Sequence, residues 1–231
     1  MGKLDTTPVP NAGSILPLAL RVAIGIWIAG VIAAAYLYLP PAEGFSAPDA
    51  ARIVVFHVPC AMLAVLAYIV SAVYAILFLA KGDAGSDLKS AVSAGLGFLF
   101  TALATVTGMV FARVQWGAAW NWDPRETSIL MLLIVYAAYF ALRGAIAQSG
   151  PRAKISAVYG ILAGVVMPFL VFVLPRMASA SLHPNKASLS PEYRIVMGCA
   201  MVGYVGLYIW LFRLHVRIGE HMSARRRARV V

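Results

Sequence analysis

Residues 54–80 read VVFHVPCAMLAVLAYIVSAVYAILFLA, and no Asp, Glu, Lys or Arg interrupts them. A helix of about 20 apolar residues crosses the hydrocarbon core of a bilayer, so this stretch predicts a transmembrane helix. The fourth such stretch along the chain, 128–142, is short and is expected either to extend through Ala147 or to tilt little in the membrane. The sequence predicts an all-α, polytopic integral membrane protein with six transmembrane helices, forming one membrane domain over residues 1–231. The other five stretches are 18–39, 91–111, 128–142, 155–174 and 195–212.

The composition supports a membrane protein, because 61% of the 231 residues are hydrophobic and only 12% are charged. The basic residues that give the chain its net charge of +10 lie mainly at the ends of the apolar stretches and in the C-terminal tail. The natural partner of such charge is anionic membrane lipid, with no nucleic acid expected. Cys60 and Cys199 are too few and too far apart for a disulfide framework or a cysteine zinc site. The first apolar stretch is too long for a signal-peptide core and is expected to be retained.

The distribution of basic residues predicts which side of the membrane each loop faces. With six spans both termini share one side, and most of the 19 Lys and Arg fall there or in the loops around Lys81 and Arg152. The positive-inside rule makes that side cytoplasmic, in a bacterial inner membrane. The loops at 40–52, 113–127 and 175–194 then face outward. The middles of the spans lack Asp, Glu, Lys, Arg and His, which disfavours a proton-coupled transporter and a cytochrome b holding haem at depth.

Two of the four histidines fall on the predicted outer side. His57 precedes Pro59, which suits the first turn of a helix, so His57 is expected just outside the helix start. His183 lies in a loop before Ser190 and Pro191, an expected N-cap and first residue of the sixth span. The two could meet above the bundle as metal ligands. Alternatively, each could simply bond water or lipid headgroups at the membrane boundary.

Three tryptophans lie in the outer connector QWGAAWNWDPRETS, residues 115–128. Trp116 and Trp120 are four residues apart, so a helical segment would stack them on one face, while Trp122 would point elsewhere. Glycine and alanine between them keep the surface low enough for a flat ligand. The alternative is an aromatic belt at the bilayer interface.

The same connector contains a helix-start signature. Asp123 at the N-cap, Pro124 at N1 and Glu126 at N3 form a capping box that needs no ligand. Arg125 opposes the helix dipole and would be better placed beside an anion. Indoles, an arginine and a helix N-terminus suit a large planar apolar molecule with carboxylates, which describes haem, although amphiphilic lipids also fit. No activated nucleophile or acid/base pair is present, so no catalytic residue is assigned and an enzyme is not expected.

Residues 116–128, WGAAWNWDPRETS, resemble the WGxxWxWD signature of the WWD family of haem-handling proteins in cytochrome c biogenesis. The six-span length, FHVP at 56–59 and SLH at 181–183 are similar to the family's haem exporter protein C group. The resemblance implies a non-covalent haem b site at the periplasmic face. It makes His57 and His183 the axial ligands of the haem iron. It assigns the holding of haem to Trp116, Trp120, Trp122 and Asp123.

The resemblance also implies partners. Proteins of this group present haem to a membrane-anchored periplasmic haem chaperone, together with ATP-binding-cassette complex subunits and a small single-span subunit. Two departures keep an alternative open. The group usually has a second tryptophan where this chain has Ala119, and WDPRET is more similar to the haem-handling subunits of cytochrome c synthases. A lipid-binding protein or transporter without haem is the other alternative.

Overall fold

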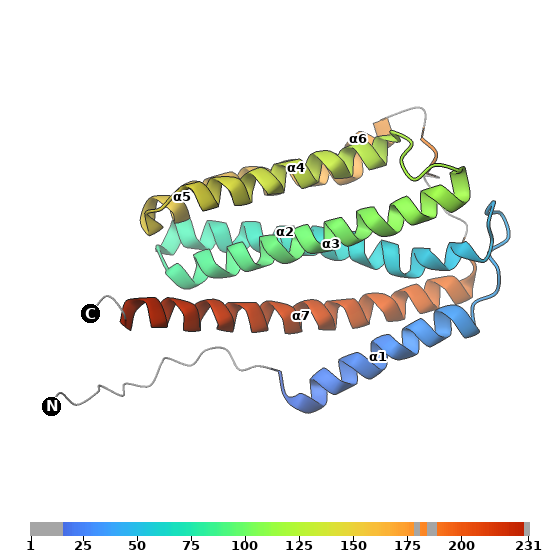
Figure 1. Cartoon of the computed structure of the whole chain (residues 1–231), viewed down its shortest axis with the longest axis horizontal. Coiled ribbons are helices and arrows are strands. Elements are labelled where there is room, and N and C mark those ends of the chain that lie inside the picture. The colour runs from blue at the N-terminus through green and yellow to red at the C-terminus, as the bar shows by residue number, and fades with distance from the viewer. Residues whose placement is uncertain (1–15, 178–180, 184–188, 229–231) are drawn as a thin grey trace.

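The computed structural model describes residues 16–177, 181–183 and 189–228, and these residues form helices and connecting loops without a strand. Six helices are long and apolar enough to cross a membrane, which confirms the predicted all-α architecture. The helices run side by side along the long axis of the molecule (Figure 1). They are α1 Leu18–Leu37, α2 Val54–Lys81, α3 Ala84–Trp116, α4 Pro124–Ala145, α5 Ser149–Pro168 and α7 Pro191–Ala228.

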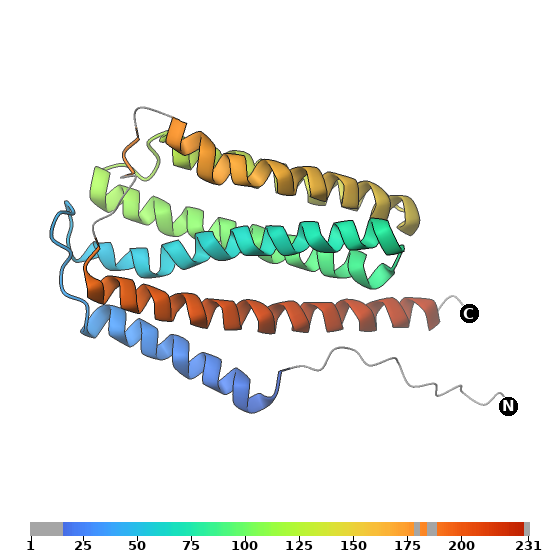
Figure 2. The ribbon, with the colours of Figure 1, turned by 180° about the vertical axis from the view of Figure 1, so that it is seen from behind.

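The central pair is α2 and α3, with α4 and α5 on one side and α7 followed by α1 on the other (Figure 1). Seen from behind, α5 lies in front of α4 and α2 lies in front of α3 (Figure 2). The core of this arrangement is aromatic: Tyr68 of α2 stacks on Tyr136 of α4 with ring centroids 3.6 Å apart. The Tyr68 hydroxyl bonds the hydroxyl of Thr101 on α3 at 2.9 Å. These contacts fix three helices of the bundle against one another.

The fifth span is not a regular α-helix to its end. After Pro168 the chain forms a π-helical segment, Phe169–Val173, and then the short helix α6, Leu174–Met177. A π-helical turn takes one more residue per hydrogen-bonded loop than an α-helical turn, and such turns are frequent at functional sites. Here it occurs in the last part of the fifth span, directly before α6.

Six helix ends meet at one end of the bundle, which we call the connector end. There α1, α3 and α6 finish, and α2, α4 and α7 begin (Figure 1). The three predicted outer loops therefore share one end, as expected. At the opposite end the Arg143 guanidinium donates two hydrogen bonds to the Asp87 carboxylate, at 2.8 and 2.7 Å, and joins α4 to α3.

Several predicted boundaries were wrong. A 3₁₀ turn, Ala50–Ile53, leads directly into α2, so His57 lies inside the first turn of α2 and Pro59 within the helix. The fourth span ends at Ala145 and does not continue through Ala147. Other boundaries were right: Pro191 is the first residue of α7, and the Ser190 carbonyl accepts the first helical hydrogen bond, from Arg194 N at 3.2 Å, so Ser190 is the N-cap residue as predicted. The Ser190 hydroxyl donates to the Glu192 carboxylate.

Candidate functional site

A cavity of about 400 Å³ opens between α2, α3, α4 and the π-helical segment at the connector end. Its volume is in the range of small-molecule binding sites. The wall is mainly apolar, and it also includes both predicted histidines, one predicted tryptophan and two arginines. These residues are His57, His183, Trp120, Arg125 and Arg176. The structure thus brings together side chains that lie far apart in the sequence.

His57 reaches the cavity from the first turn of α2. Its Nδ1 lies 3.0 Å from the Ala104 carbonyl oxygen and 3.2 Å from the Thr107 hydroxyl, both on α3. A carbonyl oxygen only accepts, so Nδ1 carries the proton and the Nε2 lone pair is free to bind a metal. Gly108 makes room for the ring, since a Cβ built there would lie 3.1 Å from His57 Cε1.

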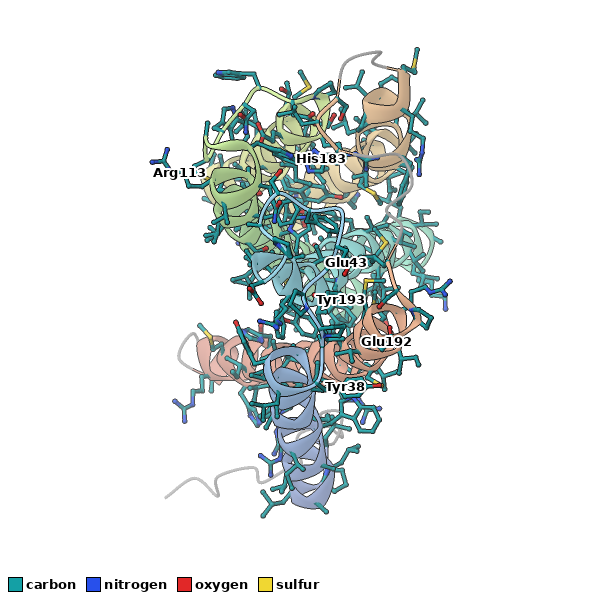
Figure 3. All side chains as sticks on the ribbon, turned by 90° about the vertical axis from the view of Figure 1, so that its right-hand side faces the viewer. Tyr38, Glu43, Arg113, His183, Glu192 and Tyr193 are labelled. Carbon is teal, nitrogen blue, oxygen red and sulfur yellow. The ribbon has the colours of Figure 1, made fainter. Side chains whose placement is uncertain are left out.

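His183 is held by the start of α4. Its Nδ1 lies 3.1 Å from Asp123 Oδ1, and the Trp116 ring meets its ring edge-on with centroids 4.8 Å apart. The carboxylate fixes the proton on Nδ1, so Nε2 of this histidine is also free. Figure 3 shows His183 at the connector end of the bundle. Burial lowers the pKa of His183, and the nearby Asp123 charge offsets this only in part. The neutral imidazole, which is the metal-binding form, is therefore favoured.

Asp123 does more than start a helix. The predicted capping box is present, with the Asp123 carboxylate accepting from Arg125 N at 2.8 Å. The other carboxylate oxygen accepts from the Ser181 hydroxyl at 2.9 Å and from Leu182 N at 2.6 Å. Its side chain is only 1% exposed. Burial opposes its ionisation, but the hydrogen bonds outweigh burial and hold the Asp123 pKa below its usual value. One carboxylate thus joins α4 to the segment that carries His183.

Arg125 lines the cavity next to Glu126. Its Nε is buried and has no hydrogen-bond partner among the described residues. Glu126 is occupied elsewhere, because its Oε2 accepts from Asn121 N at 2.7 Å and from Asp123 N at 3.3 Å. A cation in a mostly apolar cavity is stabilised by an anion, so the cavity favours a ligand that carries one.

Arg176 is a second cation in the wall, and it was not predicted. It follows the π-helical segment and donates from Nη1 to the Phe172 carbonyl. The sequence does show an arginine just beyond the fifth apolar stretch, but a cation at that position usually only marks the end of a span. Arg176 reaches the cavity wall from just beyond the π-helical segment, which local sequence patterns do not indicate.

The three tryptophans have three different environments. The predicted stacking of Trp116 and Trp120 on one helical face was wrong, because α3 ends at Trp116. Gly117 adopts φ 85°, a left-handed conformation that terminates the helix. Trp116 packs on His183, whereas Trp120 lines the cavity. Trp122 is 71% exposed, has φ 56°, and meets Trp120 edge-on with ring centroids 5.8 Å apart.

The chain is similar to known proteins over nearly its whole length. Residues 6–230 match the family model described as "Heme exporter protein C". The heme exporter protein C of Paracoccus denitrificans is 27% identical over 90% of this chain and 87% of its own length. That of Rhodobacter capsulatus is 29% identical over 94% of this chain and 90% of its own length. The cytochrome c biogenesis protein CcsA of Prochlorococcus marinus is 44% identical, but over only 31% of this chain and 22% of its own length.

Proposed function

Because the chain belongs to the haem exporter protein C family, which handles haem for cytochrome c biogenesis, we propose that it binds haem b non-covalently in the connector-end cavity. The main observation behind this proposal is that two histidines from distant segments share the same hydrogen-bonding pattern. His57 and His183 both line the cavity, and each donates from Nδ1 to a fixed acceptor. Both therefore offer Nε2 to an iron, and second-shell acceptors of this kind strengthen imidazole ligands.

The rest of the wall fits the other parts of haem. Haem supplies an iron that takes two axial nitrogens, an apolar macrocycle and two propionates. Trp120 and the aliphatic wall would contact the macrocycle. Arg125 of α4 and Arg176 of α6 would meet the propionates. The Nε of Arg125, which is buried and has no hydrogen-bond partner among the described residues, supports this assignment, because a buried donor without an acceptor costs free energy.

Delivery, rather than catalysis, is the activity that we propose for this site. The excess of Lys and Arg at the other end of the bundle supports placing the connector end in the periplasm, with both termini in the cytoplasm of a bacterium. The bound haem would be presented to a membrane-anchored periplasmic haem chaperone. ATP-binding-cassette subunits and a small single-span subunit would complete the assembly, in which residues 1–231 act as one domain.

The test is an absorption spectrum of the purified protein with and without added haem. We expect a Soret band typical of two axial histidines, which His57→Ala and His183→Ala each change. His221→Ala, a histidine near the C-terminal end of α7, is the matched control and should leave the spectrum intact. Added imidazole should restore the wild-type spectrum in each of the first two variants by filling the space of the missing ring. A colourless protein, or a band indifferent to both substitutions, would refute the proposal and favour a lipid-binding protein.

The comparisons favour an exporter-type protein over a subunit of a cytochrome c synthase. Both kinds of relative share sequence with this chain. The match to the exporter protein of Rhodobacter capsulatus covers 90% of that protein, whereas the match to CcsA covers 22% of that protein. The resemblance of WDPRET to the larger proteins is thus a local feature of a chain that matches the smaller ones throughout.

A further inference from the structure

A second hollow, of about 390 Å³, lies on the outer surface of α3, and we call it the α3 groove. Three valines one helical turn apart form its floor, and they are 58, 51 and 47% exposed, which suits contact with lipid. The groove is apolar except for one arginine. Its lining consists of Val106, Met109, Val110, Arg113, Val114 and Ala119.

Met109 borders both the α3 groove and the connector-end cavity. It is the one residue of the described chain that lines both hollows, and it is 37% exposed. A methionine side chain is unbranched and has three rotatable bonds, so it changes conformation more readily than the valines beside it. Met109 is therefore the described side chain whose movement would most readily join the two hollows.

The ends of the groove give it chemical selectivity. Ala119 leaves open a space that a larger side chain at the same position would fill. Arg113 points away from the bundle (Figure 3), and its Nη1 donates to the Gly117 carbonyl at 2.9 Å. An apolar surface with one cation at its outer end complements a flat apolar molecule that carries carboxylates on one edge.

We propose that haem reaches the cavity sideways, from the bilayer through the α3 groove, with Met109 as the movable wall. Arg113 would meet a propionate first, before the cavity arginines do. This inference rests on the proposed haem site and adds to it a route of access and a role for Ala119.

The experiment measures loading rates. Protein free of haem in lipid nanodiscs is mixed with haem-loaded vesicles, and the Soret band is followed in a stopped-flow instrument. We expect Ala119→Trp and Met109→Trp to load about tenfold more slowly, as a barrier raised by ~1.4 kcal/mol would give. Met109→Ala should load faster. Ile134→Trp, on an exposed part of α4 outside both hollows, is the control and should load at the wild-type rate.

Equilibrium haem occupancy separates the two proposals. Slower loading of Ala119→Trp and Met109→Trp supports the route, provided that Ala119→Trp, which lies outside the cavity, reaches the wild-type final spectrum. Wild-type loading rates in Ala119→Trp and Met109→Trp, or slowing by Ile134→Trp to the same degree, overturn it and leave the groove as a site for bilayer lipid only. If the wild-type protein never gives a spectrum that depends on His57 and His183, even with haem added in detergent, the haem site itself fails.

Discussion

Replacing Asp123 by asparagine should weaken haem binding without unfolding the protein. The change keeps the shape of the side chain but leaves one acceptor oxygen where two stood. On one side the carboxylate accepts from Arg125 N and His183 Nδ1, and on the other from Ser181 and Leu182 N. An NH₂ group facing His183 would move the imidazole proton to Nε2 and block the metal-binding nitrogen. An NH₂ group facing Leu182 would leave a backbone N–H without an acceptor.

The expected magnitude follows from the contacts that are lost. A buried donor left without its acceptor costs about 1–3 kcal/mol, and hydrogen bonds to a charged group are at the upper end. Either orientation of the side-chain amide that Asp123→Asn introduces disturbs two donors, and the Asp123 side chain is only 1% exposed, so solvent compensates little. We expect a loss of about 2–4 kcal/mol, which corresponds to roughly 30- to 1,000-fold weaker haem binding.

Haem titration of the purified variants, followed at the Soret band, measures this loss. Glu126→Gln is the matched control, because the backbone N–H groups of Asn121 and Asp123 both bond the same oxygen, Oε2, and a glutamine amide retains one such oxygen. Asp123→Asn in a His183→Ala background should have a much smaller effect than alone, as expected for residues that act on one another. Haem affinity of Asp123→Asn within threefold of that of Glu126→Gln would refute the assigned link between Asp123 and His183.

Three further outcomes are expected. Gly108→Ala should weaken haem binding about tenfold, because its Cβ would lie 3.1 Å from the His57 ring. Gly95→Ala, whose Cβ would have its nearest neighbour at 3.9 Å, should leave the affinity unchanged, and haem titration compares the two variants. Trp120→Ala should weaken haem binding by about 1–2 kcal/mol and Trp122→Ala by far less, because only the first lines the cavity; equal losses would contradict the structure. Arg143→Gln should lower thermal stability in detergent by about 2–3 kcal/mol and leave the haem spectrum unchanged, because its side chain is 17% exposed and pairs at the opposite end.

The sequence predicts the spans well because the bilayer imposes a single requirement on them. A run of about 20 apolar residues must be helical, whatever surrounds it, so all six helices follow from hydropathy. The capping box at Asp123 is likewise local, because N-cap and N3 are three residues apart. Helix ends were less predictable. Gly117 terminates α3 through a left-handed conformation, for which glycine is the common local signal, but the spacing of Trp116 and Trp120 predicts one helical face that continues across it.

The site depends on contacts between distant residues, which explains what the sequence could not show. The histidines could be named from their flanking prolines and from family resemblance, but their hydrogen-bond partners could not. The partner of His57 is a backbone carbonyl on α3, and Asp123 lies 60 residues from His183. Gly108 has no local signature either, because its role arises only when the His57 ring lies against it.

Because of the π-helical segment Phe169–Val173, the geometry of the site depends on the number of residues in the fifth span. An α-helical residue turns the chain by about 100°, so deleting one residue within the segment would let the helix run regularly and would rotate everything after it by that angle. Arg176 would then leave the cavity wall. Such a deletion would tend to improve the helix while damaging the site, a trade-off between stability and activity. Natural variants and designs of this span should therefore be compared by insertions and deletions as carefully as by substitutions.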